Sequence, residues 1–225
     1  MKIVFFGDSI TEGCFELYDN HAGGIDIIRD PRSGYVNLVT DRLRRLFPET
    51  EIETINAGVG GDSTGHALKR IEADVIDKNP DIAVVCFGLN DVGQRKTDEY
   101  KSNLTEIFKK LNDAHIKTIF MTPNMINTYV HHMNLAILEK TAKNCAECQN
   151  DGTMDLFMDT ARKCAEECNI ELCDVYAIWK KMSGYGVNTT ELLCNYINHP
   201  IRAMHKLFAD ALLPHLAEFI EKKLV

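Results

Sequence analysis

The sequence lacks any long hydrophobic run, and this absence limits the kinds of protein that it encodes. Its 225 residues contain no apolar stretch long enough to span a bilayer. Only four apolar residues separate Lys2 from Gly7, which is too short for the hydrophobic region of a signal peptide. We therefore expect no membrane span and a cytoplasmic location.

Positive charge is scarce relative to negative charge. Lys and Arg total 25 against 33 Asp and Glu, which gives a formal net charge of −8. A surface of this sign repels a nucleic-acid backbone and an anionic membrane, so neither is expected as the main partner. Hydrophobic residues make up 45% of the chain, and its length is sufficient for one domain with a large core.

Cysteine, in contrast, is plentiful, with eight residues. Cys86 and Cys173 lie in apolar runs, which predicts buried, reduced thiols and a reducing compartment. Two close pairs have a spacing that a structural zinc ion could use. The pairs lack the tight turns of a zinc knuckle, so we expect each to lie on a helix and expect no metal. These pairs are Cys145 with Cys148 and Cys164 with Cys168.

Strand-like and helix-like segments alternate along the chain. This alternation predicts an α/β/α three-layer sandwich around a five-stranded parallel sheet. We expect a single domain over residues 1–225, with an enlarged helical insertion around residues 124–168 that walls a pocket or makes a homo-oligomer contact. The strands are expected at residues 2–7, 51–58, 81–88, 117–123 and 170–175, and the main helices at residues 32–47, 63–80, 97–116 and 203–224.

Two segments are expected to be loops. Residues 14–34 precede the first long helix, for which Ser33 is a candidate N-cap. Arg29 and the other charges make this segment a poor match for the apolar lid of a lipase. They favour a solvated substrate, such as an acetylated sugar. His131 and His132 are adjacent in the insertion, and we expect both to be exposed, with a place in the lining of an acyl or sugar pocket as the alternative.

Polar turns follow the first three expected strands, at residues 7–10, 58–63 and 88–91. The carboxyl ends of parallel strands meet at one edge of a sheet, where α/β proteins form their sites. His199 stands before Pro200 and the last helix. A serine, glycine-rich backbone, an asparagine amide and a histidine at one rim are the groups that acyl transfer requires.

Each of these groups has a chemical reason to be there. Ser9 needs a base to remove its proton, and a neutral imidazole such as that of His199 has a suitable pKa. Attack on an ester places negative charge on the carbonyl oxygen, which fixed donors must stabilise. The N–H groups of Ser9 and Gly61 and the side-chain amide of Asn90 are candidate donors. We expect the turn carboxylates to support the loops rather than to react, and these are Asp8, Asp62 and Asp91.

Four sequence blocks resemble the SGNH (GDSL-type) esterase and lipase superfamily over nearly the whole chain. They are "FFGDSITEG", "NAGVGGDST", "FGLNDV" and "NHP", in the family's order. The resemblance implies a flavodoxin-like fold and no metal or organic cofactor. It also implies that Ser9 is the nucleophile, that His199 is the base, and that Gly61 and Asn90 complete the oxyanion hole with the Ser9 N–H.

One position departs from the family pattern, in which an aspartate stands three residues before the histidine. Tyr196 occupies that position, with Asn195 beside it. Three arrangements remain open: a backbone carbonyl orients His199, a neighbouring side chain such as Asn195 does so, or a distant carboxylate reaches it. We favour a dyad with a neutral orienting group.

The sequence thus predicts a serine esterase that acts through an acyl-enzyme. We expect short acyl groups, with acetyl esters of a carbohydrate as the leading small-molecule substrate. A lysophospholipase or thioesterase is the alternative among enzymes. A non-catalytic module that binds an anion or another ligand at the Gly-Asp-Ser turn is the alternative from another class.

Overall fold

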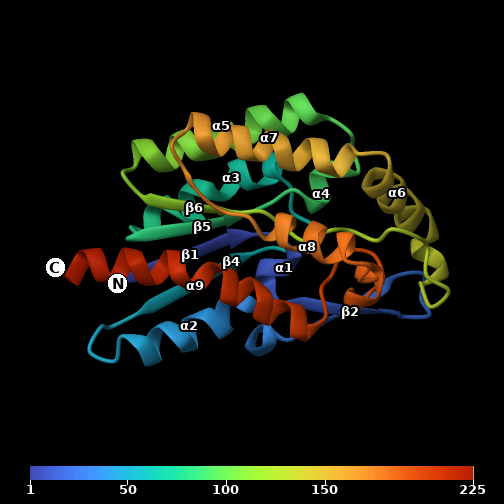
Figure 1. Ribbon diagram of the computed structural model, residues 1–225, viewed down its shortest axis with the longest axis horizontal. Coiled ribbons are helices and arrows are strands. Elements are labelled where there is room, and N and C mark those ends of the chain that lie inside the picture. The colour runs from blue at the N-terminus through green and yellow to red at the C-terminus, as the bar shows by residue number, and fades with distance from the viewer. Residues whose placement is uncertain (225) are drawn as a thin grey trace.

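The computed structural model describes residues 1–224 and contains the predicted parallel sheet (Figure 1). Its five strands lie in the order β4-β1-β5-β6-β7, and every neighbouring pair is parallel. Counted within the sheet this is the order 2-1-3-4-5 of flavodoxin-like proteins, so the predicted fold is confirmed. The strands are β1 (Lys2–Gly7), β4 (Glu53–Gly58), β5 (Ile82–Cys86), β6 (Lys117–Met121) and β7 (Glu171–Cys173).

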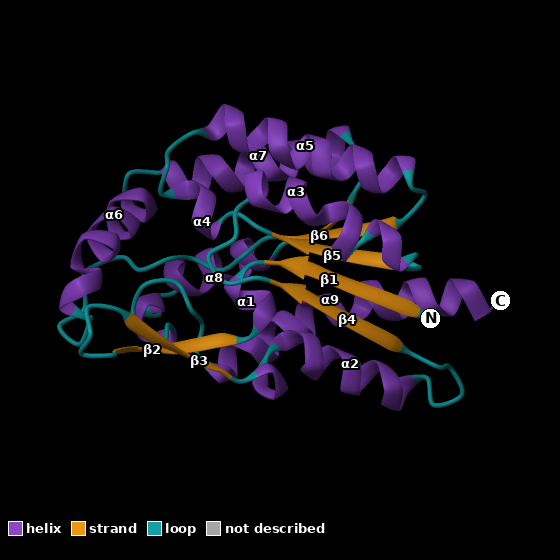
Figure 2. Cartoon of the chain, turned by 180° about the vertical axis from the view of Figure 1, so that it is seen from behind, coloured by secondary structure: helices purple, strands orange, loops and turns teal. Residues whose placement is uncertain are grey.

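Helices cover both faces of the sheet (Figure 2). One layer contains α3 (Thr64–Asp74), α5 (Thr97–Asp113) and α7 (Thr153–Glu167), and the other contains α2 (Tyr35–Leu46) and α9 (Arg202–Leu224). Every residue of β5 is buried, as expected for a central strand between two helical layers. The other helices are α1 (Ser9–Glu12), α4 (Leu89–Val92), α6 (Glu139–Asn150) and α8 (Val175–Gly184), with 3₁₀ turns at Pro31–Ser33, Ile76–Lys78, Ala136–Leu138 and Thr189–Leu192.

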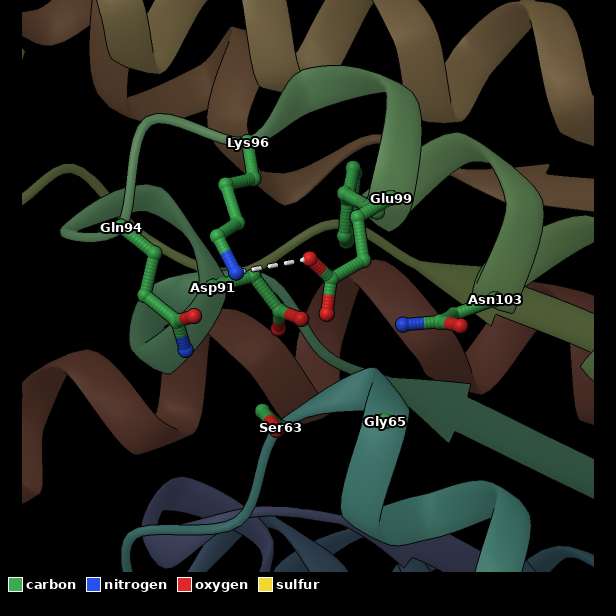
Figure 3. A pocket seen from close by; sticks show the side chains of 8 residues that line it. Ser63, Gly65, Asp91, Gln94, Lys96, Glu99 and Asn103 are labelled. Carbon is green, nitrogen blue, oxygen red and sulfur yellow. Dashed lines mark ion pairs between the residues drawn. The ribbon is translucent and has the colours of Figure 1, made fainter.

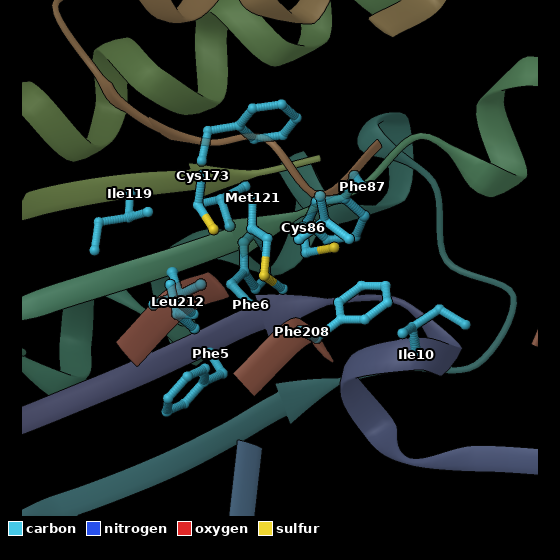
Figure 4. Close-up of a cluster of buried hydrophobic side chains, with 14 of the residues drawn as sticks. Phe5, Phe6, Ile10, Cys86, Phe87, Ile119, Met121, Cys173, Phe208 and Leu212 are labelled. Atoms are coloured by element: carbon cyan, nitrogen blue, oxygen red, sulfur yellow. The ribbon is translucent and has the colours of Figure 1, made fainter. Parts of the chain in front are cut away.

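On the face of the sheet covered by α2 and α9, buried side chains of α9 belong to the same hydrophobic cluster as those of the strands (Figure 4). Phe208 and Leu212 of α9 are fully buried near Phe5 of β1. The helix continues through Pro214 without a break. None of the helices within residues 1–224 is long and apolar enough to cross a membrane.

The predicted loop at residues 14–34 is wrong, because part of it forms an antiparallel hairpin. β2 (Cys14–Asp19) pairs with β3 (Ile25–Arg29) beyond the carboxyl edge of the sheet (Figure 2). The predicted cap is also wrong. Ser33 ends a 3₁₀ turn, and Gly34 occupies the N-cap position of α2 without a side-chain bond.

The insertion contains α6 and α7, which carry the four paired cysteines or end at them. Cys145 and Cys148 lie on α6, Cys164 lies on α7, and Cys168 is its C-cap. All four are free thiols, and the Cys148 thiol donates to the Val92 carbonyl. Among the described residues, no group of three or more His, Cys, Asp or Glu side chains is arranged to hold a metal ion.

Close packing between the end of β4 and α1 generates a stability prediction. A Cβ at Gly58 would lie 2.1 Å from the Glu12 backbone nitrogen. We expect Gly58→Ala to lower the free energy of unfolding by at least about 2 kcal/mol, because backbone must move. Gly184→Ala is the control, since nothing lies within 4 Å of its Cβ. Equal urea midpoints for the two variants would contradict the prediction.

Candidate active site

Ser9 is the first residue of α1, where the chain leaves β1. Asp8 is the N-cap, and its Oδ1 accepts a hydrogen bond of 2.9 Å from the Ile10 N–H. Gly13, in the left-handed region with φ of 89°, ends the helix after one turn. Capping at both ends fixes this short helix, so Ser9 is held at the carboxyl edge of the sheet.

His199 lies beside Ser9, although 190 residues separate them in the sequence. Its Nε2 is 3.1 Å from the Ser9 Oγ, and its Nδ1 is 2.8 Å from the Phe15 carbonyl oxygen. A carbonyl only accepts hydrogen bonds, so Nδ1 carries the proton and Nε2 is free to accept one from serine. Burial lowers the pKa of the imidazole, which favours the neutral form at neutral pH.

Asn195 and Tyr196 lie next to His199 without bonding to its ring nitrogens. The Asn195 Oδ1 accepts from the backbone N–H groups of Ile197, Asn198 and His199, at 3.0, 3.0 and 2.9 Å. The Asn195 side chain therefore shapes the turn that delivers the histidine. The ring nitrogen Nδ1 instead bonds to backbone of the hairpin.

Tyr196 stacks on His131 of the insertion, with ring centroids 3.9 Å apart and planes 11° from parallel. The prediction that His131 is exposed is wrong, because its side chain is buried and its Nε2 lies 3.2 Å from Glu191 Oε1. His132 is exposed, as predicted. The stacked pair joins the insertion to the turn that precedes His199.

Gly61 and Asn90 reach the same pocket as Ser9 and His199. Gly61 has a φ of 76°, a conformation that glycine adopts without strain. The Asn90 amide donates one hydrogen to the Asp62 carbonyl at 2.8 Å. The second hydrogen of that amide remains available for a ligand.

Asp62 is held by Arg70, a residue that the sequence analysis did not single out. The Arg70 Nε donates to Asp62 Oδ2 at 2.7 Å, and its other nitrogens donate to the carbonyls of Gly7 and Ala57 at 2.9 and 2.8 Å. One guanidinium thereby joins the ends of β1 and β4 to the glycine-rich loop. The available signal was its position two helical turns after Asp62, beside buried Ile71.

Asp91 links the starts of α3 and α4. Its carboxylate accepts from the Thr64 N–H at 3.1 Å and from the Thr64 hydroxyl at 2.5 Å. Asp91 lines a crevice of about 30 Å³ together with Ser63 and the Lys96–Glu99 ion pair (Figure 3). Neither Ser9 nor His199 lines this crevice. Asp91 therefore stabilises the loops between strands and helices and does not contact the Ser9–His199 pair.

The pocket around Ser9, which we call the ester pocket, encloses about 200 Å³. The hairpin covers it with apolar side chains, in contrast to the polar, solvated segment that we expected. Its lining residues are Ser9, Leu17, Ile25, Ile27, Gly60, Gly61, Asn90, Leu138, Thr141, Asn195, Ile197, Asn198 and His199.

The three-layer fold and a serine within hydrogen-bonding distance of a buried histidine are typical of α/β hydrolytic enzymes. Within that class the chain belongs to the GDSL-like lipase/acylhydrolase family, whose model matches residues 5–207. The family resemblance seen in the sequence is confirmed, and the chain is a carboxylic ester hydrolase.

Several relatives are similar over most of their length. An acetylxylan esterase of Geobacillus stearothermophilus is 26% identical over 192 residues, which are 80% of this chain and 78% of the relative. The crystal structure of the acetyl xylan esterase AlAXEase is 25% identical with a TM-score of 0.69, covering 96% and 99% of the two chains. A lipase/acylhydrolase structure from Enterococcus faecalis is 25% identical with a TM-score of 0.68, covering 96% and 94%.

Burial of Asp8 generates a prediction about pH and stability. Burial raises the pKa of Asp8 to about 7, with a further rise from Asp91 and Asp62, and its Oδ2 has no hydrogen-bond partner. The folded protein then binds more protons than the unfolded chain between pH 4 and 7, so this group costs stability as pH rises. Relative to Asp8→Asn, the wild type should lose at least about 1 kcal/mol of unfolding free energy from pH 4 to pH 8.

Urea unfolding at several pH values measures this difference. Asp113→Asn, at an exposed position, is the control and should follow the wild type across the range. A constant gap between wild type and Asp8→Asn would show that Asp8 is ionised throughout.

Proposed function

We propose that Ser9 and His199 form the catalytic dyad of a serine esterase, as nucleophile and general base. The contact that carries this proposal is the 3.1 Å separation of His199 Nε2 from Ser9 Oγ. Nε2 takes the serine proton while Oγ attacks the ester carbonyl carbon. The imidazolium then gives the proton to the departing alcohol, and water hydrolyses the acyl-enzyme by the same steps.

The negative charge on the carbonyl oxygen has three proposed donors, the N–H groups of Ser9 and Gly61 and the amide of Asn90. Gly61 and Asn90 line the ester pocket with Ser9, and the bond from Asn90 to the Asp62 carbonyl fixes the plane of that amide. Donors held in advance stabilise the developing charge without reorganising.

The Phe15 carbonyl takes the orienting role in this proposal, in place of the aspartate that the family pattern places before the histidine. It fixes the productive tautomer of His199 through the 2.8 Å bond to Nδ1. Arg202 holds the carbonyl in position, because its guanidinium bonds to Glu16 and stacks over the Phe15 ring at 4.4 Å. Arg202 is a positioning residue in this scheme.

The proposed substrates are acetyl esters carried by a carbohydrate. Two relatives named acetylxylan esterases support this choice. Lysine and arginine are absent from the lining of the ester pocket among the described residues, which disfavours the anionic groups of a lysophospholipid or a coenzyme thioester. The same lack of lysine and arginine around Ser9 disfavours an anion-binding module.

We also propose a cytoplasmic location, on the evidence of the thiols. All eight cysteines are free, and six of them are buried. Free thiols in this number are typical of a compartment that keeps cysteine reduced.

Hydrolysis of p-nitrophenyl esters of increasing acyl length tests the dyad and the acyl preference together. We expect acetyl to be cleaved faster than octanoyl. Ser9→Ala and His199→Ala should reduce turnover to background, and Asn90→Ala should lower kcat by about 100-fold or more because an oxyanion donor is lost. Asn195→Ala should have a smaller effect, since that side chain contacts backbone of the turn.

Labelling by a fluorophosphonate probe is the companion measurement, because only an activated serine reacts. Label on Ser9 in the wild type, lost in His199→Ala, is the expected pattern. Near-normal turnover by His199→Ala would refute its assignment as base, and faster cleavage of octanoyl esters would refute the acetyl preference.

The contacts of Arg202 with Glu16 and with the Phe15 ring generate a second prediction. Arg202→Gln should lower kcat by about tenfold to a hundredfold with little change in KM, because the histidine loses its alignment. In ¹⁵N spectra of histidine, the His199 ring should change from one Nδ1–H tautomer to a mixture.

Arg42→Gln is the matched control for this variant. Arg42 lies on α2, and the variant breaks its ion pair of 2.5 Å with Asp210. Asp210 is on α9, as Arg202 is, but lies outside both the site and the contacts of Phe15. If both variants lose activity in proportion to stability while the His199 spectrum stays unchanged, Arg202 is structural only.

A further inference from the structure

We propose that a second cavity beside the ester pocket binds the alcohol part of the substrate, and that its occupant is an uncharged ring-shaped polyol such as a sugar. This inference rests on the proposed function, and it locates the part of the site that would select the leaving group. The cavity, which we call the leaving-group cavity, encloses about 380 Å³. Its lining residues are Glu16, Leu17, Tyr18, Met133, Leu135, Leu138, Cys194, Asn195 and Tyr196.

The two cavities adjoin each other. Leu17, Leu138 and Asn195 line both of them. These residues come from the hairpin, the insertion and the turn before His199, so each of the three segments contributes to both cavities. A molecule bound at Ser9 and extending past these residues would enter the leaving-group cavity.

The chemistry of the reaction fixes which part of the ester extends that way. The carbonyl oxygen must point to the oxyanion donors, and Gly61 and Asn90 line only the ester pocket. The departing oxygen must receive its proton from His199 Nε2. The leaving-group cavity is built on Cys194, Asn195 and Tyr196, in the turn that leads to His199. The alcohol therefore lies on this side.

The lining indicates the chemical class of that alcohol. Tyr18 is 54% exposed and Met133 is 63% exposed, so both offer apolar surface to a ligand before it binds. Such surfaces pack against the C–H face of a sugar ring, and aromatic side chains contribute the most per residue. Tyr196 is half-buried, is held by its stack on His131, and adds a second aromatic ring to the lining.

Charge in the cavity favours a neutral occupant. Glu16 is its one charged side chain, and Arg202 holds the pKa of that carboxyl below its ordinary value. The paired carboxylate is an acceptor for a hydroxyl group and has no hydrogen to donate to a phosphate. Lys, Arg and His are absent from the nine described lining residues, and the nearby Arg202 is already paired with Glu16 and Asp30.

Two acetyl esters with different alcohols test the inference. We expect Tyr18→Ala to lower kcat/KM by about tenfold for a methyl glycoside bearing one acetyl group, mainly through KM. For ethyl acetate, whose alcohol is much smaller than a sugar, kcat/KM should stay within about twofold, because Tyr18 does not line the ester pocket. Tyr185→Ala is the matched control, because Tyr185 is 78% exposed and lies outside both cavities.

Equal losses on both esters, or no loss on either, would overturn the assignment of the cavity. A binding measurement separates this failure from failure of the proposed function, because it requires no turnover. The unacetylated methyl glycoside, titrated into Ser9→Ala enzyme, should bind about tenfold more weakly when Tyr18→Ala is added. Absence of binding to Ser9→Ala, or equal binding by the double variant, would refute the cavity even if acetyl esters are cleaved.

Discussion

The hydrogen bond between His199 Nδ1 and the Phe15 carbonyl is the contact on which the arrangement of the site depends. It connects the start of the hairpin to the turn before α9, 184 residues further along the chain. A carboxylate side chain can rotate to follow a histidine, whereas a backbone carbonyl moves only with its strand. The position of β2 therefore determines the alignment of His199 with Ser9.

The other support of the site is an arrangement of buried carboxylates at the ends of three strands. Asp62 is the member paired with a cation, through Arg70. Asp91 bonds to Thr64 instead, and burial raises its pKa to about 6. Asp8 has one oxygen without a partner. These groups fix the loops at a cost in stability, as is common where a fold positions functional residues.

Elements with a repeated pattern could be predicted from the sequence, and contacts made by backbone could not. The apolar run of β5 and the helical spacing of α5 reflect burial, so both were found close to their observed ends. The sequence could not identify which residue orients His199, because the orienting group is a backbone carbonyl and any amino acid at position 15 has one. The hairpin was missed because the apolar residues of β2 come in adjacent pairs, Cys14 with Phe15 and Leu17 with Tyr18, so the alternation typical of a strand is absent.

The missed hairpin is also the element that joins binding to catalysis. Within four consecutive residues of β2, the Phe15 carbonyl bonds to His199, Glu16 bonds to Arg202, and Leu17 and Tyr18 line cavities. The pairing of β2 with β3 shifts register between Cys14 and Leu17, and successive side chains of β2 line the leaving-group cavity. The strand therefore offers both its backbone and its side chains to the site. A ligand that packs on Tyr18 contacts β2, the same strand whose Phe15 carbonyl aligns His199. The departure from the family's aspartate thus places the orientation of His199 under the control of a segment that also contacts substrate in our proposal.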